Sequence, residues 1–324
     1  MLRAAIFGAG HWGTRLIAAV QGKSAKITFV SAVTRNPAGQ KVLADRFGLS
    51  LTADAPAVLA DPDIDAVVLA TPHSRHAAEV IAAAQAGKHV FVEKPFTLTR
   101  ADAEAAIAAC DAAGITLQVG FNRRYAPAYL DMTRRIAAGE IGTVRHIEGQ
   151  FSGPASYQTE PGNWRSNQTE SPGGSMTARG VHVIDGMIAI AGPIETVIAL
   201  SERQVHEIDV DDTTSCLLRF GGGVTGYLGT LHATAPFYRM HVFGSKGALE
   251  MRGETELIAT DLAGKIERTT FDAADKERAV LEAFADAVTA GVKFPIPPRE
   301  IVNNVAVLEA LTESAKSGKS TSVA

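Results

Sequence analysis

Three glycines near the amino terminus constrain the fold of this chain more than any other feature of its sequence. Gly8, Gly10 and Gly13 are spaced as G-x-G-x-x-G. The apolar run at residues 4–7 predicts a β-strand before them, and residues 12–21 predict a helix after them. In that context the first glycine permits a tight turn, the second lets the backbone approach a pyrophosphate, and the third lets helix and strand pack closely. We therefore expect this loop to bind a dinucleotide, with its phosphates facing the N–H groups of the helix.

The end of the second predicted strand, at residues 27–33, bears on which dinucleotide binds. An acidic residue about 20 positions after the glycines commonly binds the ribose 2′-hydroxyl of NAD. Here the strand is followed by Thr34 and Arg35, and no carboxylate is available. A hydroxyl and a guanidinium would tolerate and pair with a 2′-phosphate. We therefore expect NADP in preference to NAD; the alternative is that Arg35 is a solvated surface residue.

The first 120 or so residues alternate short β-rich runs with alanine-rich helical stretches, which is typical of a parallel sheet covered by helices on both faces. Further strands are predicted at 66–70, 90–92 and 115–120, and helices are predicted to end before Gly48 and to span 76–86 and 101–113.

The pattern changes after Asn122, where we place the boundary between a dinucleotide-binding domain at 1–122 and a second domain at 123–324. Glycine-rich turns join the later strand-like segments without intervening helices, which predicts a largely antiparallel sheet. The expected strands are 144–151, 213–220, 224–232 and 238–243, and the expected helices are 175–191, 275–290 and 299–316. The predicted fold class is α/β, with a doubly wound parallel sheet followed by an α/β domain.

Composition narrows the classes of partner. The 324 residues include 35 acidic and 31 basic side chains, and the formal net charge of −4 offers no basic surface for nucleic acid or anionic lipid. No run reaches the roughly 18 apolar residues of a membrane span, and no leader pattern opens the chain. Cys110 and Cys216 are too far apart for a metal-ligand motif. We expect a cytoplasmic protein that binds a small molecule and no metal.

Residues that follow the predicted parallel strands should border one crevice, because ligands of open α/β sheets bind at the carboxyl ends of the strands. They are Thr71, Pro72 and His73; Glu93, Lys94 and Pro95; and Phe121, Asn122 and Arg123. Lys94 could hold a substrate oxygen and stabilise charge that develops on it during hydride transfer. Taken alone, a lysine after a strand is more often a solvated surface group.

These motifs together resemble the glucose-fructose oxidoreductase/inositol dehydrogenase/MocA family over nearly the full length of the chain. The most specific element is Glu93-Lys94-Pro95, and the others include the glycine loop, residues 71–76, residues 120–125 and the segment from Gly173 through His182 to Asp185. The resemblance implies a Rossmann domain, an open-sheet domain that supports oligomers, here a homodimer or homotetramer, and hydride transfer between NAD(P) and a sugar, polyol or related cyclic alcohol. The cofactor-binding residues that we expect are Gly8, Gly10, His11, Trp12, Gly13, Thr34, Arg35, Thr71, Pro72, His73, His76, Glu93, Lys94 and Asn122.

The resemblance assigns substrate binding and proton transfer to the position of His182, which lies off the apolar stripe of the predicted helix at 175–191. An imidazole is well suited to take an alcohol proton near neutral pH. Taken in isolation, a helical histidine is more often structural. Lys94 and His182 are thus the expected catalytic residues.

One position departs from the family pattern. Many members carry an aspartate four residues before this histidine, and here that residue is Ala178. The loss of a carboxylate that could orient the imidazole places the usual proton relay and a simple polyol substrate in question. The neighbouring Arg179 either binds a substrate carboxylate or serves as a solvated charge.

The remaining candidates for substrate binding come from loops of the second domain. Trp164 could cover a sugar ring or pack a long loop. The full expected set is Arg123, Tyr125, Trp164, Arg165, Arg179, His182 and Asp185. The leading hypothesis is an NADP-dependent dehydrogenase or reductase acting on a sugar, sugar acid, inositol-like polyol or other cyclic hydroxy compound. The alternatives are an NAD-dependent glycoside hydrolase of the same family and a non-catalytic nucleotide-binding regulator.

Overall fold

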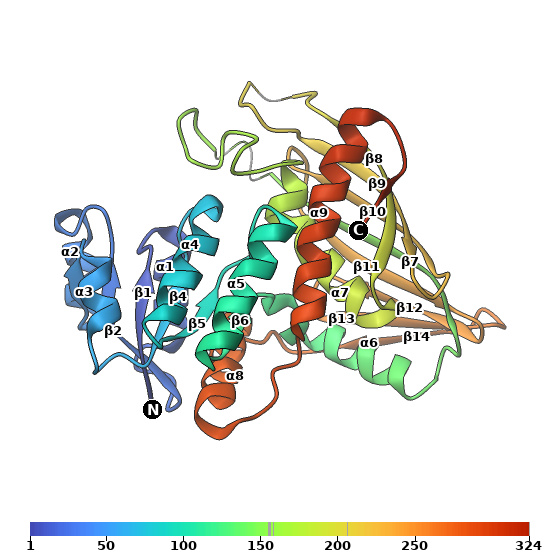
Figure 1. Ribbon diagram of the computed structural model, residues 1–324. Coiled ribbons are helices and arrows are strands. Elements are labelled where there is room, and N and C mark those ends of the chain that lie inside the picture. Colours follow the sequence, from blue (N-terminus) through green and yellow to red (C-terminus); the bar gives the residue numbers. More distant parts are fainter. Residues whose placement is uncertain (155–156, 158, 206, 324) are drawn as a thin grey trace. The chain divides into compact units, whose positions relative to one another are not determined.

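The chain divides into two compact units in the computed structural model, which describes residues 1–154, 157, 159–205 and 207–323 (Figure 1). Unit 1 comprises Met1–Thr97, Ala101–Asn122 and Asp275–Pro298. Unit 2 comprises Leu98–Arg100, Arg123–Ala274 and Arg299–Ala324. The chain leaves unit 1 after Asn122 and returns to it for a single helical segment.

Unit 1 is built on a six-stranded parallel sheet with the order β3-β2-β1-β4-β5-β6. This is the strand order of a doubly wound Rossmann fold, in which the topological switch point lies between β1 and β4. The strands are β1 (Leu2–Phe7), β2 (Ile27–Val33), β3 (Ser50–Thr52), β4 (Ala66–Leu69), β5 (His89–Val92) and β6 (Leu117–Val119). The four residues of β4 are all buried, as expected for a central strand covered on both faces.

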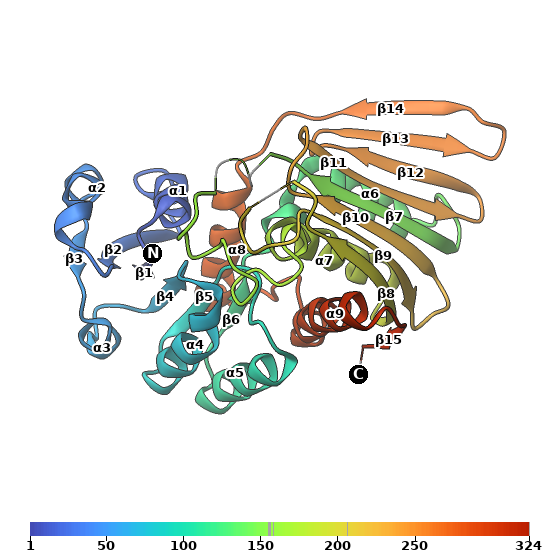
Figure 2. The same ribbon diagram turned by 90° about the horizontal axis from the view of Figure 1, so that it is seen from above.

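Helices cover both faces of this sheet. Figure 2 shows α1 and α8 on one face and α4 and α5 on the other. The helices of the unit are α1 (His11–Val20), α2 (Lys41–Phe47), α3 (Ala55–Ala60), α4 (His76–Gln85), α5 (Arg100–Ala113) and α8 (Lys276–Ala290). The parallel sheet and its helices confirm the predicted class of the first domain.

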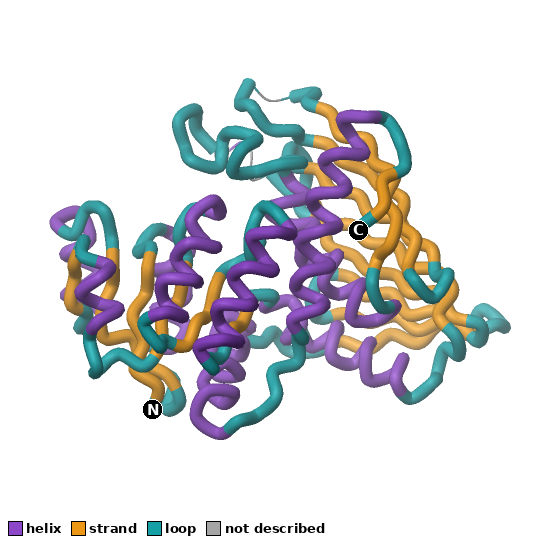
Figure 3. The backbone as a smooth tube through the Cα atoms, viewed as in Figure 1, coloured by secondary structure: helices purple, strands orange, loops and turns teal. Residues whose placement is uncertain are grey.

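Unit 2 is dominated by a nine-stranded mixed sheet with the order β14-β13-β12-β11-β7-β10-β9-β8-β15; Figure 3 draws its strands, like those of unit 1, in orange. Only β7 and β10 pair in parallel, and the other neighbours are antiparallel. The strands are β7 (Val144–Ser152), β8 (Ile194–Glu202), β9 (Thr213–Phe220), β10 (Thr225–Leu231), β11 (Phe237–Gly244), β12 (Gly247–Arg252), β13 (Glu256–Asp261), β14 (Ile266–Thr270) and β15 (Thr321–Ser322). The largely antiparallel second sheet is confirmed.

Three helices lie on one face of the nine-stranded sheet: α6 (Pro127–Ala137), α7 (Val181–Ala191) and α9 (Pro298–Ser317). A five-residue π-helix, Met176–Gly180, precedes α7, so the helix predicted at 175–191 is α-helical only in its second part. Gly173 and Gly174 just before it adopt positive φ angles of 65° and 51°, which other residues rarely reach. Among the described residues, no helix combines the length and apolar character that crossing a membrane would need.

The structure differs from the sequence prediction in where α8 packs. We expected residues 123–324 to form one domain, but Asp275–Pro298 belongs to unit 1. The apolar side chains Val280, Leu281 and Phe284 of α8 are buried, and Phe284 contacts the ring of Phe91 on β5. Periodicity identified the helix, but an apolar face does not by itself specify which unit buries it.

Candidate active site

The glycine loop has the shape that a pyrophosphate needs. Gly8 adopts a φ of +94°, and a Cβ there would lie 2.5 Å from the carbonyl oxygen of Ala70. A Cβ on Gly13 would overlap the carbonyl oxygen of Gly8. A Cβ on Gly10, in contrast, would meet no heavy atom within 4 Å. The first and third glycines are therefore required by the fold itself, whereas the second keeps open space above the backbone.

The amino end of α1 is suited to an anion. Gly10 is its N-cap, the first turn contains no acidic residue, and no side chain caps the helix. His11 is exposed and Trp12 is half-buried. The free N–H groups and the positive end of the helix dipole therefore face open space beside Gly10. This cradle fits a dinucleotide pyrophosphate.

The end of β2 carries no carboxylate in the structure either. Arg35 is exposed, while the Thr34 hydroxyl accepts a hydrogen bond from the backbone N–H of Asn36 at 3.4 Å. The loop is further closed by Asn36, whose Oδ1 accepts the N–H of Gly39 at 3.1 Å. The short polar turn thus leaves the guanidinium of Arg35 at the surface, where it can pair with an anionic group.

The loop after β4 is held by its own side chains. The Thr71 hydroxyl donates to Glu79 Oε2 at 2.5 Å, and Arg75 forms an ion pair with the same carboxylate. His76 is fully buried, with Nδ1 2.9 Å from the Pro95 carbonyl oxygen and Nε2 3.1 Å from the Thr71 carbonyl oxygen. His76 therefore links the loops that follow β4 and β5. Pro72 begins a short 3₁₀ turn at His73–Arg75, and His73 is buried with its ring 5.9 Å from that of His76.

Lys94 follows β5 at the same edge of the sheet. The Glu93 carboxylate beside it is buried and accepts the Lys94 backbone N–H at 3.3 Å. Burial raises the pKa of Glu93 to about 6. The positive charge of Lys94 and the nearby Trp12 indole both oppose that rise. The Trp12 Nε1 itself makes no hydrogen bond of good geometry to the described residues. A Cβ on Gly120 would lie 2.8 Å from Glu93 Oε1, so the glycine after β6 makes room for this carboxylate. The Lys94–Pro95 peptide bond is cis.

Asn122 after β6 contacts a residue that the sequence did not single out. Its Nδ2 donates to Glu277 Oε1 at 3.3 Å, and Arg15 of α1 pairs with the same oxygen at 2.9 Å. Arg15 also lies over the Trp12 ring, 5.3 Å from its centroid. Glu277 is 5% exposed and stands in the first turn of α8. It ties that helix to the start of α1 and the end of β6, and no local sequence signal identifies it.

His182 lies in the first turn of α7 and is 6% exposed. Its ring centroid is 6.3 Å from that of Phe151 on β7. Because Met176–Gly180 is a π-helix, Ala178 is not one regular α-helical turn before His182. A Cβ on Gly180 would overlap the Met176 sulfur, so the glycine leaves room for that side chain. Single π-turns inside helices frequently accompany functional sites.

Asp185 does not present a free carboxylate. Arg124 donates from Nε to Asp185 Oδ2 at 2.8 Å and from Nη2 to Oδ1 at 2.7 Å, and it also pairs with Glu300 at 2.6 Å. Asp185 is 2% exposed. Burial lowers the pKa of Arg124, but the two carboxylates raise it by more. This placement favours a structural role for Asp185, in contrast to our expectation that it binds substrate.

The other substrate-binding candidates lie in two places on unit 2. Arg123 and Arg179 both lie over the Phe151 ring. The Tyr125 hydroxyl is buried without a hydrogen-bond partner among the described residues, and burial raises its pKa to about 12. Trp164 and Arg165 instead stack on each other, with the guanidinium carbon 3.8 Å from the ring centroid, in the loop before the π-helix.

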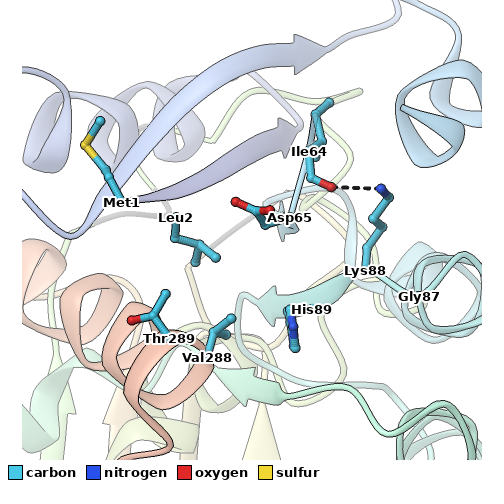
Figure 4. A pocket seen from close by; sticks show the side chains of 9 residues that line it. All are labelled: Met1, Leu2, Ile64, Asp65, Gly87, Lys88, His89, Val288 and Thr289. Carbon is cyan, nitrogen blue, oxygen red and sulfur yellow. Dashed lines mark hydrogen bonds between the residues drawn. The ribbon is translucent and has the colours of Figure 1, made fainter. Parts of the chain in front are cut away.

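The cavity drawn in Figure 4 lies elsewhere on unit 1. Its volume is about 360 Å³, and Leu2 of β1, Asp65 before β4 and His89 of β5 line it at the amino ends of these strands. The Lys88 amine at its rim already donates to the carbonyl oxygens of Asp61 and Ile64. The cavity is therefore at the opposite edge of the sheet from the glycine loop and is not part of the candidate nucleotide site.

Comparison with known proteins identifies the family. The model described as "Oxidoreductase family, NAD-binding Rossmann fold" of GFO/IDH/MocA matches residues 2–121, and the GFO/IDH/MocA C-terminal domain matches residues 129–250. The chain belongs to the GFO/IDH/MocA oxidoreductase family. It is an NAD(P)-dependent oxidoreductase with a Rossmann domain, as the resemblance implied.

Relatives within the GFO/IDH/MocA family are similar over different lengths. The chain is 39% identical to scyllo-inositol 2-dehydrogenase (NAD(+)) of Bacillus subtilis over 48% of this chain and 47% of that protein. It is 28% identical to D-xylose 1-dehydrogenase (NADP(+)) 2 of Haloferax volcanii over 97% of both chains. A crystal structure of a putative NADPH-dependent oxidoreductase from Desulfitobacterium hafniense superposes with a TM-score of 0.92, at 26% identity, over 99% of this chain and 97% of that one.

Proposed function

We propose that this GFO/IDH/MocA oxidoreductase uses NADP and transfers a hydride to or from a hydroxyl-bearing carbon of a sugar, sugar acid, inositol-like polyol or other cyclic hydroxy compound. One observation carries the proposal: the carboxyl edge of the parallel sheet combines an open pyrophosphate cradle at Gly10 with Lys94 after β5 and no carboxylate after β2. The named dehydrogenases act on scyllo-inositol and xylose, which supports a sugar or polyol substrate.

The chain supplies the residues that bind and orient the reactants. We assign the phosphates to the N–H groups at the start of α1, the 2′-phosphate to Arg35, and substrate contact to Lys94 and His182. When bound, the nicotinamide supplies the acceptor or donor of the hydride.

Oxidation of an alcohol breaks one C–H and one O–H bond and forms a C=O bond. The imidazole of His182 takes the hydroxyl proton, and the Lys94 ammonium stabilises the negative charge on the oxygen as the hydride leaves the same carbon. Reduction is the reverse, with His182 returning the proton. The relatives named above are dehydrogenases and oxidoreductases, which supports this reaction over glycoside hydrolysis or a regulatory role.

Calorimetric titration of the cofactor-stripped protein with NADPH and NADH tests the nucleotide assignment. We expect NADPH to bind at least about tenfold tighter, a difference of roughly 1.4 kcal/mol. Arg35→Ala should weaken NADPH binding by about tenfold, because a charge-assisted hydrogen bond to the 2′-phosphate is lost from an exposed site, and should leave NADH binding unchanged.

Gly10→Val is the matched control for this titration. A side chain at position 10 enters open space, so the variant should fold normally and lose affinity for both nucleotides alike. A wild-type protein that prefers NADH, or an Arg35→Ala variant with unchanged preference, would contradict the NADP assignment.

We also propose that the protein forms a homodimer or homotetramer through the uncovered face of the sheet in unit 2. Ile198, Leu217 and Tyr227 are cross-strand neighbours on β8, β9 and β10, and all three are exposed, Leu217 by 57%. Leu200 on the same strand as Ile198 is 69% exposed. A continuous apolar row of this kind is typical of a protein interface.

Leu217→Lys should shift the protein to a smaller species in sedimentation velocity, because burying a lysine in an apolar interface is unfavourable. Val292→Lys is the control, since Val292 is exposed to a similar extent on unit 1. An unchanged sedimentation coefficient for Leu217→Lys would exclude this face as the interface.

The buried free cysteines Cys110 and Cys216 fit a reducing compartment, and we assign the enzyme to the cytoplasm.

A further inference from the structure

The ring of Phe151 is a common neighbour of two arginines and His182. The guanidinium carbon of Arg123 is 5.2 Å from the ring centroid and that of Arg179 is 5.7 Å away. The centroid of the His182 imidazole lies 6.3 Å from that of the same ring, and the Tyr238 ring lies 4.6 Å from it at an angle of 35°. Two cations therefore lie on the same aromatic side chain as the residue that we assign to proton transfer.

The two arginines differ in how their charge is balanced. Arg123 forms an ion pair with Glu254. Arg179 forms no ion pair with the described residues of unit 2, and its Nη1 is buried without a hydrogen-bond partner. Burial lowers the pKa of Arg179, and the like charge of Arg123 lowers it further. An unsatisfied, partly desolvated guanidinium of this kind is stabilised most by an anion.

The backbone beside Arg179 makes room for its side chain. Gly153 directly follows β7, and a Cβ there would lie 2.9 Å from Arg179 Nη2. The Gly153 N–H donates to the Leu231 carbonyl oxygen at 3.0 Å, so the loop holds its place independently of the arginine. The π-helix Met176–Gly180 carries Arg179, which lies three residues before His182. Local structure thus holds the guanidinium at Phe151 and does not leave it to extend into solvent.

We propose that Arg179, with Arg123 beside it, binds a carboxylate of the substrate, so that the enzyme acts on a sugar acid and not on a neutral sugar or polyol. This rests on the function proposed above and specifies its substrate class. The charge balance favours a carboxylate. Glu254 neutralises Arg123, so among the described residues around Phe151 the uncompensated positive charge is that of Arg179. A phosphate monoester carries nearly two negative charges near neutral pH, which is more than this charge balances. A guanidinium also matches the planar carboxylate with two parallel hydrogen bonds.

This anion site also accounts for Ala178, at the position where the family resemblance implies an aspartate. An aspartate at position 178 would place a negative charge next to Arg179, where it would neutralise the guanidinium and repel a substrate carboxylate. Alanine removes both effects and leaves the arginine to the ligand. The departure from the family pattern is then part of the substrate preference.

The test compares matched pairs that differ only in the acid group: D-glucose with D-glucuronate, D-galactose with D-galacturonate and D-mannose with D-mannuronate. Each is titrated by calorimetry into protein loaded with NADPH or with NADP⁺, and turnover is followed by the absorbance of NADPH. We expect at least one acid to bind about tenfold or more tightly than its neutral partner. In Arg179→Gln this preference should disappear, while affinity for the neutral partner and for NADPH stays the same. Arg179→Lys should retain part of it, because the charge remains without the planar fork.

Arg145→Gln is the matched control, because Arg145 is an exposed arginine on β7 and should leave the preference intact. Three results would overturn the carboxylate site: no acid that binds more tightly than its partner, an unchanged preference in Arg179→Gln, or tighter binding of D-glucose 6-phosphate than of every acid. A protein that fails to bind NADPH would instead contradict the proposed function, so the two failures are distinguishable.

Discussion

Lys94→Met should lose about a hundredfold to a thousandfold in kcat, and a smaller loss of NADPH affinity should report the cofactor contact that we also expect of this side chain. The side chain is the group that we assign to stabilising the substrate oxygen, and methionine has a similar length without the charge. The loop should persist, because two of its contacts do not depend on the Lys94 side chain. His76 binds the Pro95 carbonyl oxygen, and Glu93 accepts the backbone N–H of Lys94.

Steady-state kinetics with the best substrate from the paired panel and calorimetry with NADPH measure the two effects separately. In the wild type the positive charge of Lys94 lowers the pKa of Glu93 and so opposes the effect of burial. Loss of Lys94 should therefore raise that pKa above about 6. Lys23→Met, at an exposed lysine of unit 1, should match the wild type in both assays. A Lys94→Met enzyme within tenfold of the wild-type kcat would remove Lys94 from the catalytic residues.

Arg124→Met should destabilise the protein by about 3 to 5 kcal/mol, the range for removing one partner of a buried ion pair. The side chains of Asp185 and Glu300 are 2% and 18% exposed, and both depend on the same guanidinium. Methionine fills much of the volume but leaves the buried Asp185 carboxylate without its two hydrogen bonds from Arg124. Since Asp185 lies three residues after His182 on α7, the substitution should also disturb the position of the imidazole.

Urea denaturation measures the change in the free energy of unfolding. Arg134→Met is the control, because Arg134 is 64% exposed in its ion pair with Asp131 and such surface pairs contribute about 0 to 1 kcal/mol. A loss of less than about 1 kcal/mol in Arg124→Met would show that the ion pair does not hold unit 2 together.

Most of the predicted elements lie within a few residues of their observed positions. β2 spans Ile27–Val33 as predicted, and the strands at 213–220 and 238–243 correspond to β9 and β11. The prediction missed α6, although its apolar positions are spaced as in an amphipathic helix, and it also missed β8 and the short strands β12 to β14. β14 shows why: its residues are mostly exposed and polar, so it exists because β13 offers a pairing edge and not because of its own pattern.

The sequence by itself determined the parts of this protein that depend on neighbours along the chain. The spacing of Gly8, Gly10 and Gly13 between a strand and a helix specified the nucleotide loop, because each glycine answers a local requirement of turn, approach or packing. Glu93-Lys94-Pro95 was placed at the carboxyl edge of the sheet by its position after a predicted strand. The motifs along the chain also indicated the family to which it belongs.

Only the tertiary structure decided which distant side chains meet. Asn122 and Glu277 are 155 positions apart, and Arg124 and Asp185 are 61 apart. Asp185 is a substrate-binding candidate in the sequence, yet in the fold its carboxylate pairs with Arg124. The role that we propose for Arg179 depends on its neighbours Phe151, Arg123 and Gly153. Such contacts depend on how sheets and helices pack, and the free energy of burying a charge depends on what lies around it in space, which the order of residues along the chain does not express.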